Sequence, residues 1–441
     1  MDGFVTVPDT DHYWLTNGRV PLCLLSPPLE PIAALREFPH QEELAAVDVE
    51  IKGGAISTIA PAGKTDFDPT PGVNLEQGLI WPCFIDMHTH LDKGHLWPRC
   101  PNPDGTFLGA LETVRNDHSN WQADELYQRM EFGLKCSYAH GTQAIRTHLD
   151  SFGSLGKTNF QVFDTLRRQW QTRLSLQAVC LVSLDYFLTP DADPLAQLVA
   201  DFGGVLGGVT YMNKDLVAQL DRTFTLAKHY GLDLDFHTDE SLNPDDITLR
   251  YVAEAALRHD FQGAITCGHC CSLSVQTADV VAETLTLVKA ANIGIVSLPM
   301  CNLYLQDRQS AQTPRYRGIT LLHELHQQGI SVALSSDNCR DPFYAYGDHD
   351  GLEVFKQSVR IGHLDRPFDH WPKSLTSRPA QLMGLNDVGT LTPNTPADLI
   401  CFKARTLNEL ISRAQCDRVV IRQGHPIDTT LPDYQELDSL F

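Results

Sequence analysis

The segment IDMHTHLDKGH, residues 85–95, follows an apolar run and places two histidines one residue apart. Alternate side chains of a β-strand point to the same face, so His88 and His90 would lie together if this run is a strand. Two imidazoles on one face, next to Asp86 and Asp92, suit a divalent metal ion. The same residues also fit an ordinary polar strand end, so the segment alone leaves both interpretations open.

Short apolar runs and helical stretches alternate through the middle of the chain, and the order of these elements predicts the fold. Helical stretches include 124–141, 217–231 and 318–329, the last two ending at a glycine that can cap a helix. Eight such β/α units in about 300 residues predict an α/β protein with a (β/α)₈ TIM barrel. A doubly wound sheet is the competitor, but no G-x-G-x-x-G follows an early strand. The apolar runs are 78–86, 143–150, 174–183, 205–211, 232–240, 264–270, 293–299 and 330–338.

The two chain ends have a different pattern, with short alternating segments that are typical of β-strands. Residues 46–58 predict a hairpin with a Gly-Gly turn, and short strands are expected within 389–403 and 418–427. We therefore expect a small β-sandwich module formed by both chain ends. The predicted domains are 1–80 and 385–441 for the two parts of this module and 81–384 for the barrel.

Composition and charge exclude several classes of partner. The chain has 441 residues, 34 of them Lys or Arg and 55 Asp or Glu, for a net charge of −21. A field of that sign repels phosphate backbones and anionic lipids, so we expect neither a nucleic-acid nor a membrane partner. The N-terminal residues lack a basic stretch followed by an apolar one, which favours a cytoplasmic protein. A small-molecule ligand and a possible homo-oligomer remain as partners, and the twelve cysteines are expected to be reduced thiols.

Polar side chains gather where the predicted strands end. In a TIM barrel the active site lies at the C-terminal ends of the strands, so these positions, dispersed in sequence, would form one ring. The ring consists of His88 and His90, Arg146, His148 and Asp150, His237, Asp239 and Glu240, His269, and Asp337 and Asn338.

This ring has the residue types needed for metal-assisted hydrolysis. Three nitrogens from His88, His90 and His237 with one oxygen from Asp337 suit Zn²⁺ or Fe²⁺. Such an ion would lower the pKa of water to about 7, so that hydroxide attacks the substrate. Glu240 would shuttle the proton to a leaving nitrogen. The remaining catalytic groups are His269, as a hydrogen-bond donor to the reacting centre, and Asp337, as a second proton acceptor.

Three other polar residues of the ring are expected to have structural roles. His148 is expected to be a hydrogen-bonded structural residue at a strand end. Arg146 and Asp150 are expected to pair with each other beneath the site.

Together the motifs CFIDMHTHLDK, RTHLD, HTDE, GHCCSLS, RGIT and SSDNCRDPFYAYG resemble the amidohydrolase superfamily, most closely its cytosine deaminase-like members, over about residues 75–425. The resemblance implies one catalytic metal ion, zinc or iron, on His88, His90, His237 and Asp337. It implies a proton shuttle at Glu240 and a catalytic histidine at His269. Members with two metal ions carry a lysine on the fourth strand, whereas VLGGVTYMN, residues 205–213, has none, so a single divalent ion per chain is expected.

Two departures from the cytosine deaminase pattern fall in the expected substrate-binding region. Ser183 stands where the resemblance places a glutamine that reads the pyrimidine edge, and Phe343 stands where a tryptophan is expected. A serine hydroxyl cannot match a donor and an acceptor together as an amide does. Asn338 and Lys93 are the other expected substrate-binding residues, and Trp97 and Arg99, which follow the same predicted strand as Lys93, could also reach into the pocket. A ring that is larger than cytosine or differently substituted is therefore expected.

Three functions are compatible with these residues. The leading one is metal-dependent hydrolytic deamination of an amino-substituted nitrogen heterocycle, with release of ammonia. The second is removal of a substituted amine from a triazine-like ring or opening of a cyclic amide. The third is a non-catalytic ligand-binding relative, against which the complete ligand set and Glu240 argue.

Overall fold

The structure is a computed structural model that describes residues 3–26, 43–63 and 70–441. The described chain forms two compact units. The first comprises residues 1–85, 135–143 and 350–432, and the second comprises 86–134, 144–349 and 433–441, apart from residues outside the described ranges. Residues 1–2, 27–42 and 64–69 of the predicted 1–80 segment lie outside the described residues.

The first unit contains a sheet to which both chain ends contribute. Its strands run in the order β16-β15-β14-β5-β1-β2-β3, and β4 pairs with β1. The two ends meet where β14 pairs antiparallel with β5, with Leu399 opposite Pro82. The strands are β1 His12–Pro21, β2 Leu44–Lys52, β3 Ala55–Pro61, β4 Gly72–Asn74, β5 Leu79–Pro82, β14 Leu399–Phe402, β15 Val419–Arg422 and β16 His425–Pro426.

The expected hairpin near residue 50 is present as β2 and β3. Its turn uses Gly53 and Gly54, whose φ angles of 59° and 79° are in the left-handed region that glycine adopts without a Cβ clash. A Cβ on Gly54 would also lie 2.9 Å from the carbonyl oxygen of Gln423, so the close backbone approach requires glycine here.

The apolar runs of the middle of the chain form parallel strands in a TIM-barrel-like α/β arrangement. Strands β6, β7 and β8 form one sheet, and β13-β12-β11-β10-β9 form another. Isolated parallel bridges join Thr89 to Asp337 and Val179 to Val205. The strands are β6 Phe84–Thr89, β7 Thr142–Asp150, β8 Ser175–Leu181, β9 Leu206–Val209, β10 Leu234–Thr238, β11 Ile265–His269, β12 Gly294–Ser297 and β13 Val332–Leu334.

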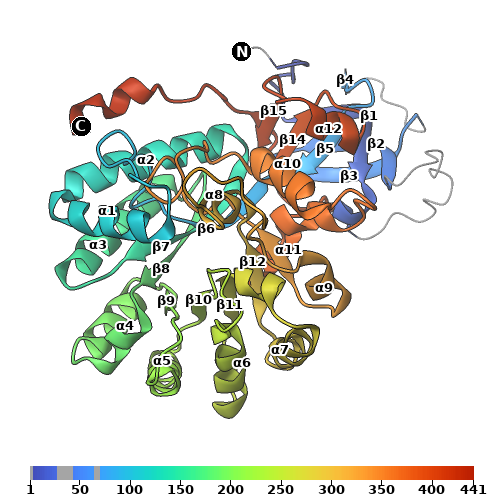
Figure 1. Cartoon of the computed structure of the whole chain (residues 1–441). Helices are drawn as coiled ribbons and strands as arrows, with labels where there is room; N and C mark the ends of the chain where they lie inside the picture. The colour runs from blue at the N-terminus through green and yellow to red at the C-terminus, as the bar shows by residue number, and fades with distance from the viewer. Residues whose placement is uncertain (1–2, 27–42, 64–69) are drawn as a thin grey trace. The chain divides into compact units, whose positions relative to one another are not determined.

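Helices follow most of these strands, and Figure 1 shows α3 to α7 along the outer side of β7 to β12. The helices are α1 Phe107–Asp117, α2 Ala123–Ala139, α3 Ser154–Trp170, α4 Ala192–Asp201, α5 Leu216–Tyr230, α6 Thr248–Arg258, α7 Ala278–Ala290, α8 Pro299–Leu305, α9 Leu322–Gln327, α10 Gly351–Gly362, α11 Ser377–Leu382 and α12 Leu407–Ser412.

Helix α5 shows why these segments fold as the sequence predicts. Leu216, Leu220, Phe224 and Ala227 recur at helical spacing and are all buried. The helix ends at Gly231, whose φ of 66° and N–H to the carbonyl of Ala227 make a left-handed C-cap.

The expected helix over 318–329 is wrong in its first turn. Helix α9 spans only Leu322–Gln327, and Gly318 has a φ of 68°, which is outside the helical region.

Among the described residues, no helix combines the length and the apolar character that crossing a membrane requires.

Candidate functional site

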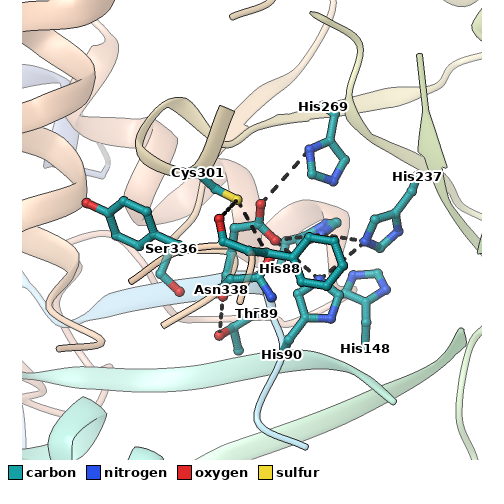
Figure 2. A network of polar contacts seen from close by, with 12 residues as sticks. His88, Thr89, His90, His148, His237, His269, Cys301, Ser336 and Asn338 are labelled. Carbon is teal, nitrogen blue, oxygen red and sulfur yellow. Dashed lines mark hydrogen bonds and ion pairs between the residues drawn. The ribbon is translucent and has the colours of Figure 1, made fainter. Parts of the chain in front are cut away.

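Three imidazoles converge at the C-terminal ends of β6 and β10, as Figure 2 shows. The Nε2 atoms of His88 and His237 are 3.2 Å apart, and those of His237 and His90 are 3.3 Å apart. His88 and His90 lie two residues apart at the end of β6, so the strand directs both rings to one side. Gly268 on β11 leaves room for this arrangement, because a Cβ there would lie 2.7 Å from Cε1 of His88.

Asp337 brings a carboxylate to the same point. Its Oδ1 lies 3.2 Å from Nε2 of His90 and 3.7 Å from Nε2 of His88, and the residue is fully buried. The backbone N–H of Asp337 donates to the carbonyl of His88 at 2.9 Å, and Thr89 Oγ1 donates to the Asp337 carbonyl at 2.8 Å. The end of β6 therefore holds Asp337 in place through its own backbone and side chain.

The four atoms fit a divalent metal ion. A tetrahedral ion with bonds of 2.0–2.1 Å separates its ligand atoms by about 3.3–3.4 Å, close to the 3.2–3.7 Å found here. Three Nε2 atoms that face one another cannot all be paired among themselves, since a neutral imidazole has one donor and one acceptor. In the described residues, both carboxylate oxygens of Asp337 have no hydrogen-bond partner. The three imidazoles and the carboxylate therefore do not satisfy one another's hydrogen-bonding groups.

Charge also favours an ion at this position. Burial lowers the pKa of His88 and of His237 well below the ordinary value, and the neighbouring imidazoles lower it further. Both rings are therefore neutral, which is the form that binds a metal. Burial opposes the ionisation of Asp337, but the neighbouring imidazoles of His269 and His90 lower its pKa.

Glu240 and His269 lie beside this cluster. Glu240 Oε1 is 3.3 Å from Nδ1 of His269, and Asp337 Oδ2 is 4.0 Å from the same nitrogen. Burial raises the pKa of Glu240 well above the ordinary value, and the negative charge of Asp337 raises it further. Burial lowers the pKa of His269 to about 4. A carboxyl group that binds a proton more readily than usual, next to a neutral imidazole, is suited to proton transfer.

Helix α8 contributes two residues that the sequence analysis did not identify. Asn302 Nδ2 lies 3.0 Å from Nδ1 of His269, and Cys301 Sγ lies 3.7 Å from Oδ1 of Asn338. Both residues lie just after the run 293–299, at the end of the predicted seventh strand. Extending the strand-end argument to that run would have found them.

A pocket opens next to Glu240, and the four expected substrate-binding residues, Ser183, Asn338, Phe343 and Lys93, all line it. Its wall is rich in apolar side chains from α1, β8 and β9. The further lining residues are His90, Phe107, Leu111, Val114, Arg115, His118, Asp150, Phe152, Leu181, Val182, Val209, Tyr211, His237, Glu240, His269 and Asp337.

Lys93 in this pocket is held by a buried carboxylate. Lys93 Nζ donates to Oδ1 of Asp150 at 2.7 Å, and His118 Nε2 lies 3.0 Å from Oδ2 of Asp150. Burial opposes ionisation of Asp150, but the charge of Lys93 outweighs it and keeps the pKa well below the usual range. Asp150 is therefore ionised in the pocket wall, and His118 is a pocket residue that the sequence analysis missed.

Three expectations near the site are wrong, and they concern Arg146, Arg99 and His148. Arg146 does not pair with Asp150; its Nη1 donates to Oδ2 of Asp235 on β10 at 2.9 Å and to Oγ1 of Thr266 on β11 at 3.3 Å. Arg99 donates to Asp117 and Glu125 instead of lining the pocket.

His148 is not a hydrogen-bonded strand-end residue. In the described residues neither of its ring nitrogens has a hydrogen-bond partner. Its ring lies 4.0 Å from that of His88, centroid to centroid, so it packs directly against the cluster.

Comparisons with known proteins found similar sequences and structures that cover most of the chain. Residues 187–424 match the model of the amidohydrolase family. The chain is 47% identical over 442 residues to the pterin deaminase of Rhizobium rhizogenes, covering 99% of this chain and 98% of that protein. It is 23% identical to the N-isopropylammelide isopropyl amidohydrolase of a Pseudomonas species, over 82% of this chain and 89% of the relative. Among solved structures, the 5-methylcytosine deaminase of Klebsiella pneumoniae matches with a TM-score of 0.79 and 22% identity, covering 96% and 98% of the two chains.

The chain belongs to the amidohydrolase family. It is a hydrolase of the deaminase type, which acts on carbon–nitrogen bonds other than peptide bonds. The family is metal-dependent, and the buried His and Asp clusters of this chain agree with that. The non-catalytic alternative is thereby left without support.

Proposed function

We propose that this enzyme deaminates a pterin-like ring by hydrolysis and releases ammonia. The observation that carries the proposal is the placement of Glu240 beside the His88, His90, His237 and Asp337 cluster, at the base of a pocket with apolar walls. A relative that covers nearly the whole chain at 47% identity is a pterin deaminase, which supports the choice of ring.

The proposed cofactor is one catalytic Zn²⁺ or Fe²⁺ ion held by these three histidines and Asp337. Such an ion lowers the pKa of water, so that a nucleophile is available near neutral pH. Strand β9 reads LGGV and offers no lysine for a bridging ligand, which supports a single ion in this centre.

In this proposal Glu240 accepts a proton from the attacking water and passes it to the leaving amino group. Its raised pKa matches that task, because a group that both takes and gives a proton works best with a pKa near the operating pH. Asp337 is the second proton acceptor.

His269 is proposed to donate a hydrogen bond to the reacting centre. Asn302 Nδ2 donates to its Nδ1, so the ring proton is placed on Nε2. Among the described residues Nε2 of His269 has no hydrogen-bond partner, which leaves it available to substrate.

Substrate selection is proposed to depend on the pocket walls. Phe107 and Phe343 lie 5.7 Å apart, centroid to centroid, in an edge-to-face arrangement at one side of the pocket. Ser183 is short, and its hydroxyl is already bonded to the carboxylate of Asp185. The longer side chain of a glutamine at position 183 would occupy space that Ser183 leaves open, and a flat two-ring heterocycle would fill that space.

The finer architecture belongs to the same proposal. The bridges Thr89–Asp337 and Val179–Val205 support a closed (β/α)₈ barrel. The mixed sheet built from both chain ends supports the terminal β-sandwich module, with bounds near residues 80 and 385.

The test is release of ammonia from a panel of pterins, purines, cytosine and amino-triazines, with alkylamine release from N-alkyl triazines measured in parallel. We expect pterins to have the highest kcat/KM. Faster release of alkylamine than of ammonia would favour the second function, removal of a substituted amine from a triazine-like ring. The Pseudomonas relative, which is 23% identical to this chain, is the reason for including this test.

A further inference from the structure

A second group of metal-ligating side chains lies outside the catalytic cluster. The side chains of His95, Cys339 and His349 place one ligand atom each within 4.8 Å of one another. All three residues are buried, with exposed fractions of 1%, 1% and 3%. None of them lines the pocket beside Glu240. Two imidazoles and one thiol at such distances are a donor set that proteins use for Zn²⁺.

The backbone fixes the positions of these side chains. His95 has a φ of 65° and His349 a φ of 54°, and both angles are in the left-handed region, which few non-glycine residues adopt. The N–H of His95 donates to the carbonyl of Cys339 at 3.0 Å, and the N–H of Arg340 donates to the carbonyl of Tyr346 at 2.9 Å. The loop after β6 and the loop after β13 are thus joined at this group.

The surroundings provide His95 with no alternative partner. In the described residues neither ring nitrogen of His95 has a hydrogen-bond partner, and the ring of Phe132 lies 4.7 Å away, centroid to centroid. Gly133 of α2 leaves room beside His349, because a Cβ there would lie 3.1 Å from its Nε2. A buried imidazole with two unpaired nitrogens is rare unless an ion or water completes it.

Burial, with the groups around it, favours the neutral form of His95. Burial lowers the pKa of His95 well below the ordinary value, and His349, Arg340 and Arg129 lower it further. A neutral imidazole has the lone pair that a metal needs. Two nearby guanidinium groups oppose a cation, but a thiolate at Cys339 would supply the compensating negative charge.

We propose that His95, Cys339 and His349 bind a second divalent ion of the zinc type, with a water as the fourth ligand. The ion would link the loop that follows His90 to the loop that contains Asp337, and so hold two ligands of the catalytic cluster at their mutual distance. The catalytic centre would still contain one ion, and the site does not depend on which heterocycle the enzyme deaminates.

The C-terminal residues cover this group. The ring of Tyr434 stacks on Phe132 at 5.5 Å, and its hydroxyl donates to Oδ1 of Asp348 at 3.3 Å. The guanidinium of Arg340 lies 4.3 Å from the centre of the same ring. The proposed ion is therefore shielded from bulk water, which suits a structural role.

Sulfur ligation distinguishes the second site from the catalytic one, because the catalytic ligands are nitrogen and oxygen. X-ray absorption of the zinc-saturated enzyme should show a sulfur neighbour at about 2.3 Å from zinc. Cys339→Ser should remove this signal and about half of the bound zinc. Cys301→Ser is the matched control, since Cys301 is the buried thiol near Asp337, and this variant should keep both.

Absence of zinc-bound sulfur in the wild-type enzyme would overturn the proposal. So would a sulfur signal that Cys301→Ser removes and Cys339→Ser retains. If Cys339→Ser does not fold, as judged by circular dichroism, His95→Gln decides. Loss of one zinc equivalent from that variant supports the site, and retention of both ions with the sulfur signal unchanged refutes it.

Discussion

Glu240 Oε1 lies 3.3 Å from Nδ1 of His269, which is buried, and the Glu240 side chain is only 10% exposed. We assign proton transfer to Glu240 and hydrogen bonding with the reacting centre to His269, so the two proposed roles lie side by side. Its geometry leads to the first of four predictions.

Glu240→Gln should retain metal and fold but lose roughly 10²–10⁴-fold in kcat, since an amide of nearly the same shape cannot carry a proton. Steady-state ammonia release, with metal analysis of the same sample, measures this. Glu254→Gln on α6 is the matched control, because Glu254 pairs with Arg250 at the surface. Near-normal turnover in Glu240→Gln would transfer the shuttle role to Asp337.

His237→Ala should weaken metal binding at the catalytic centre by more than the roughly 10–100-fold typical of residues that only orient ligands. The reason is that His237 Nε2 lies within 3.2–3.3 Å of two other proposed ligand atoms. Metal content after dialysis against a graded chelator measures the change. His229→Ala, at the exposed end of α5, serves as the control and should retain the wild-type metal content.

Cytosine should be a poorer substrate than pterin, and Ser183→Gln should narrow the gap. A polar ring edge left unpaired in a buried site costs roughly 1–3 kcal/mol, or about one to two powers of ten in kcat/KM. The ratio of kcat/KM for the two substrates is the measurement, with Ser183→Ala as the control for loss of the hydroxyl. If cytosine is the best substrate and Ser183→Gln leaves it unimproved, another residue reads the ring edge.

Asp350→Asn should destabilise the protein at pH 7 by roughly 3 kcal/mol, the scale for breaking a buried ion pair. Both Asp350 oxygens accept from Arg418 at 2.7 Å. Burial opposes ionisation of Asp350, but the charge of Arg418 outweighs it and keeps the pKa far below the usual range.

The sign of the pH dependence follows from that lowered pKa. The stabilisation by Asp350 is fully present above the unfolded-state pKa of about 3.9 and is lost as pH falls toward the folded-state value. The midpoint of urea unfolding should thus differ between wild type and Asp350→Asn at pH 7, and differ less below about pH 4. Asp9→Asn, at an exposed position, should show no such difference. A gap that is constant with pH would contradict the assignment.

The sequence predicted the strands well because parallel strands buried on both faces have continuous apolar runs. The polar residues that end those runs, such as His237 and His269, could be located for the same reason. Contacts between side chains distant in sequence could not be predicted. Asp150 was expected to pair with Arg146, and only the packed structure shows that it binds Lys93 and His118 instead.

Helix α9 illustrates a different limit. The apolar spacing of residues 318–329 fits a helix, but Gly318 adopts a φ of 68° and the chain enters the helix only at Leu322. A Cβ at Gly318 would also lie 2.3 Å from Cβ of Gln306, a tertiary contact that periodicity does not reveal.

A metal ion bound by the histidine cluster would affect how long the protein survives as well as how fast it works. An ion that binds the folded chain and not the unfolded one stabilises the fold in proportion to the logarithm of its concentration. In a metal-poor medium the same polypeptide would open more often and be degraded sooner. Nutrient supply would then set the abundance of this enzyme after translation, without any change in its gene's expression.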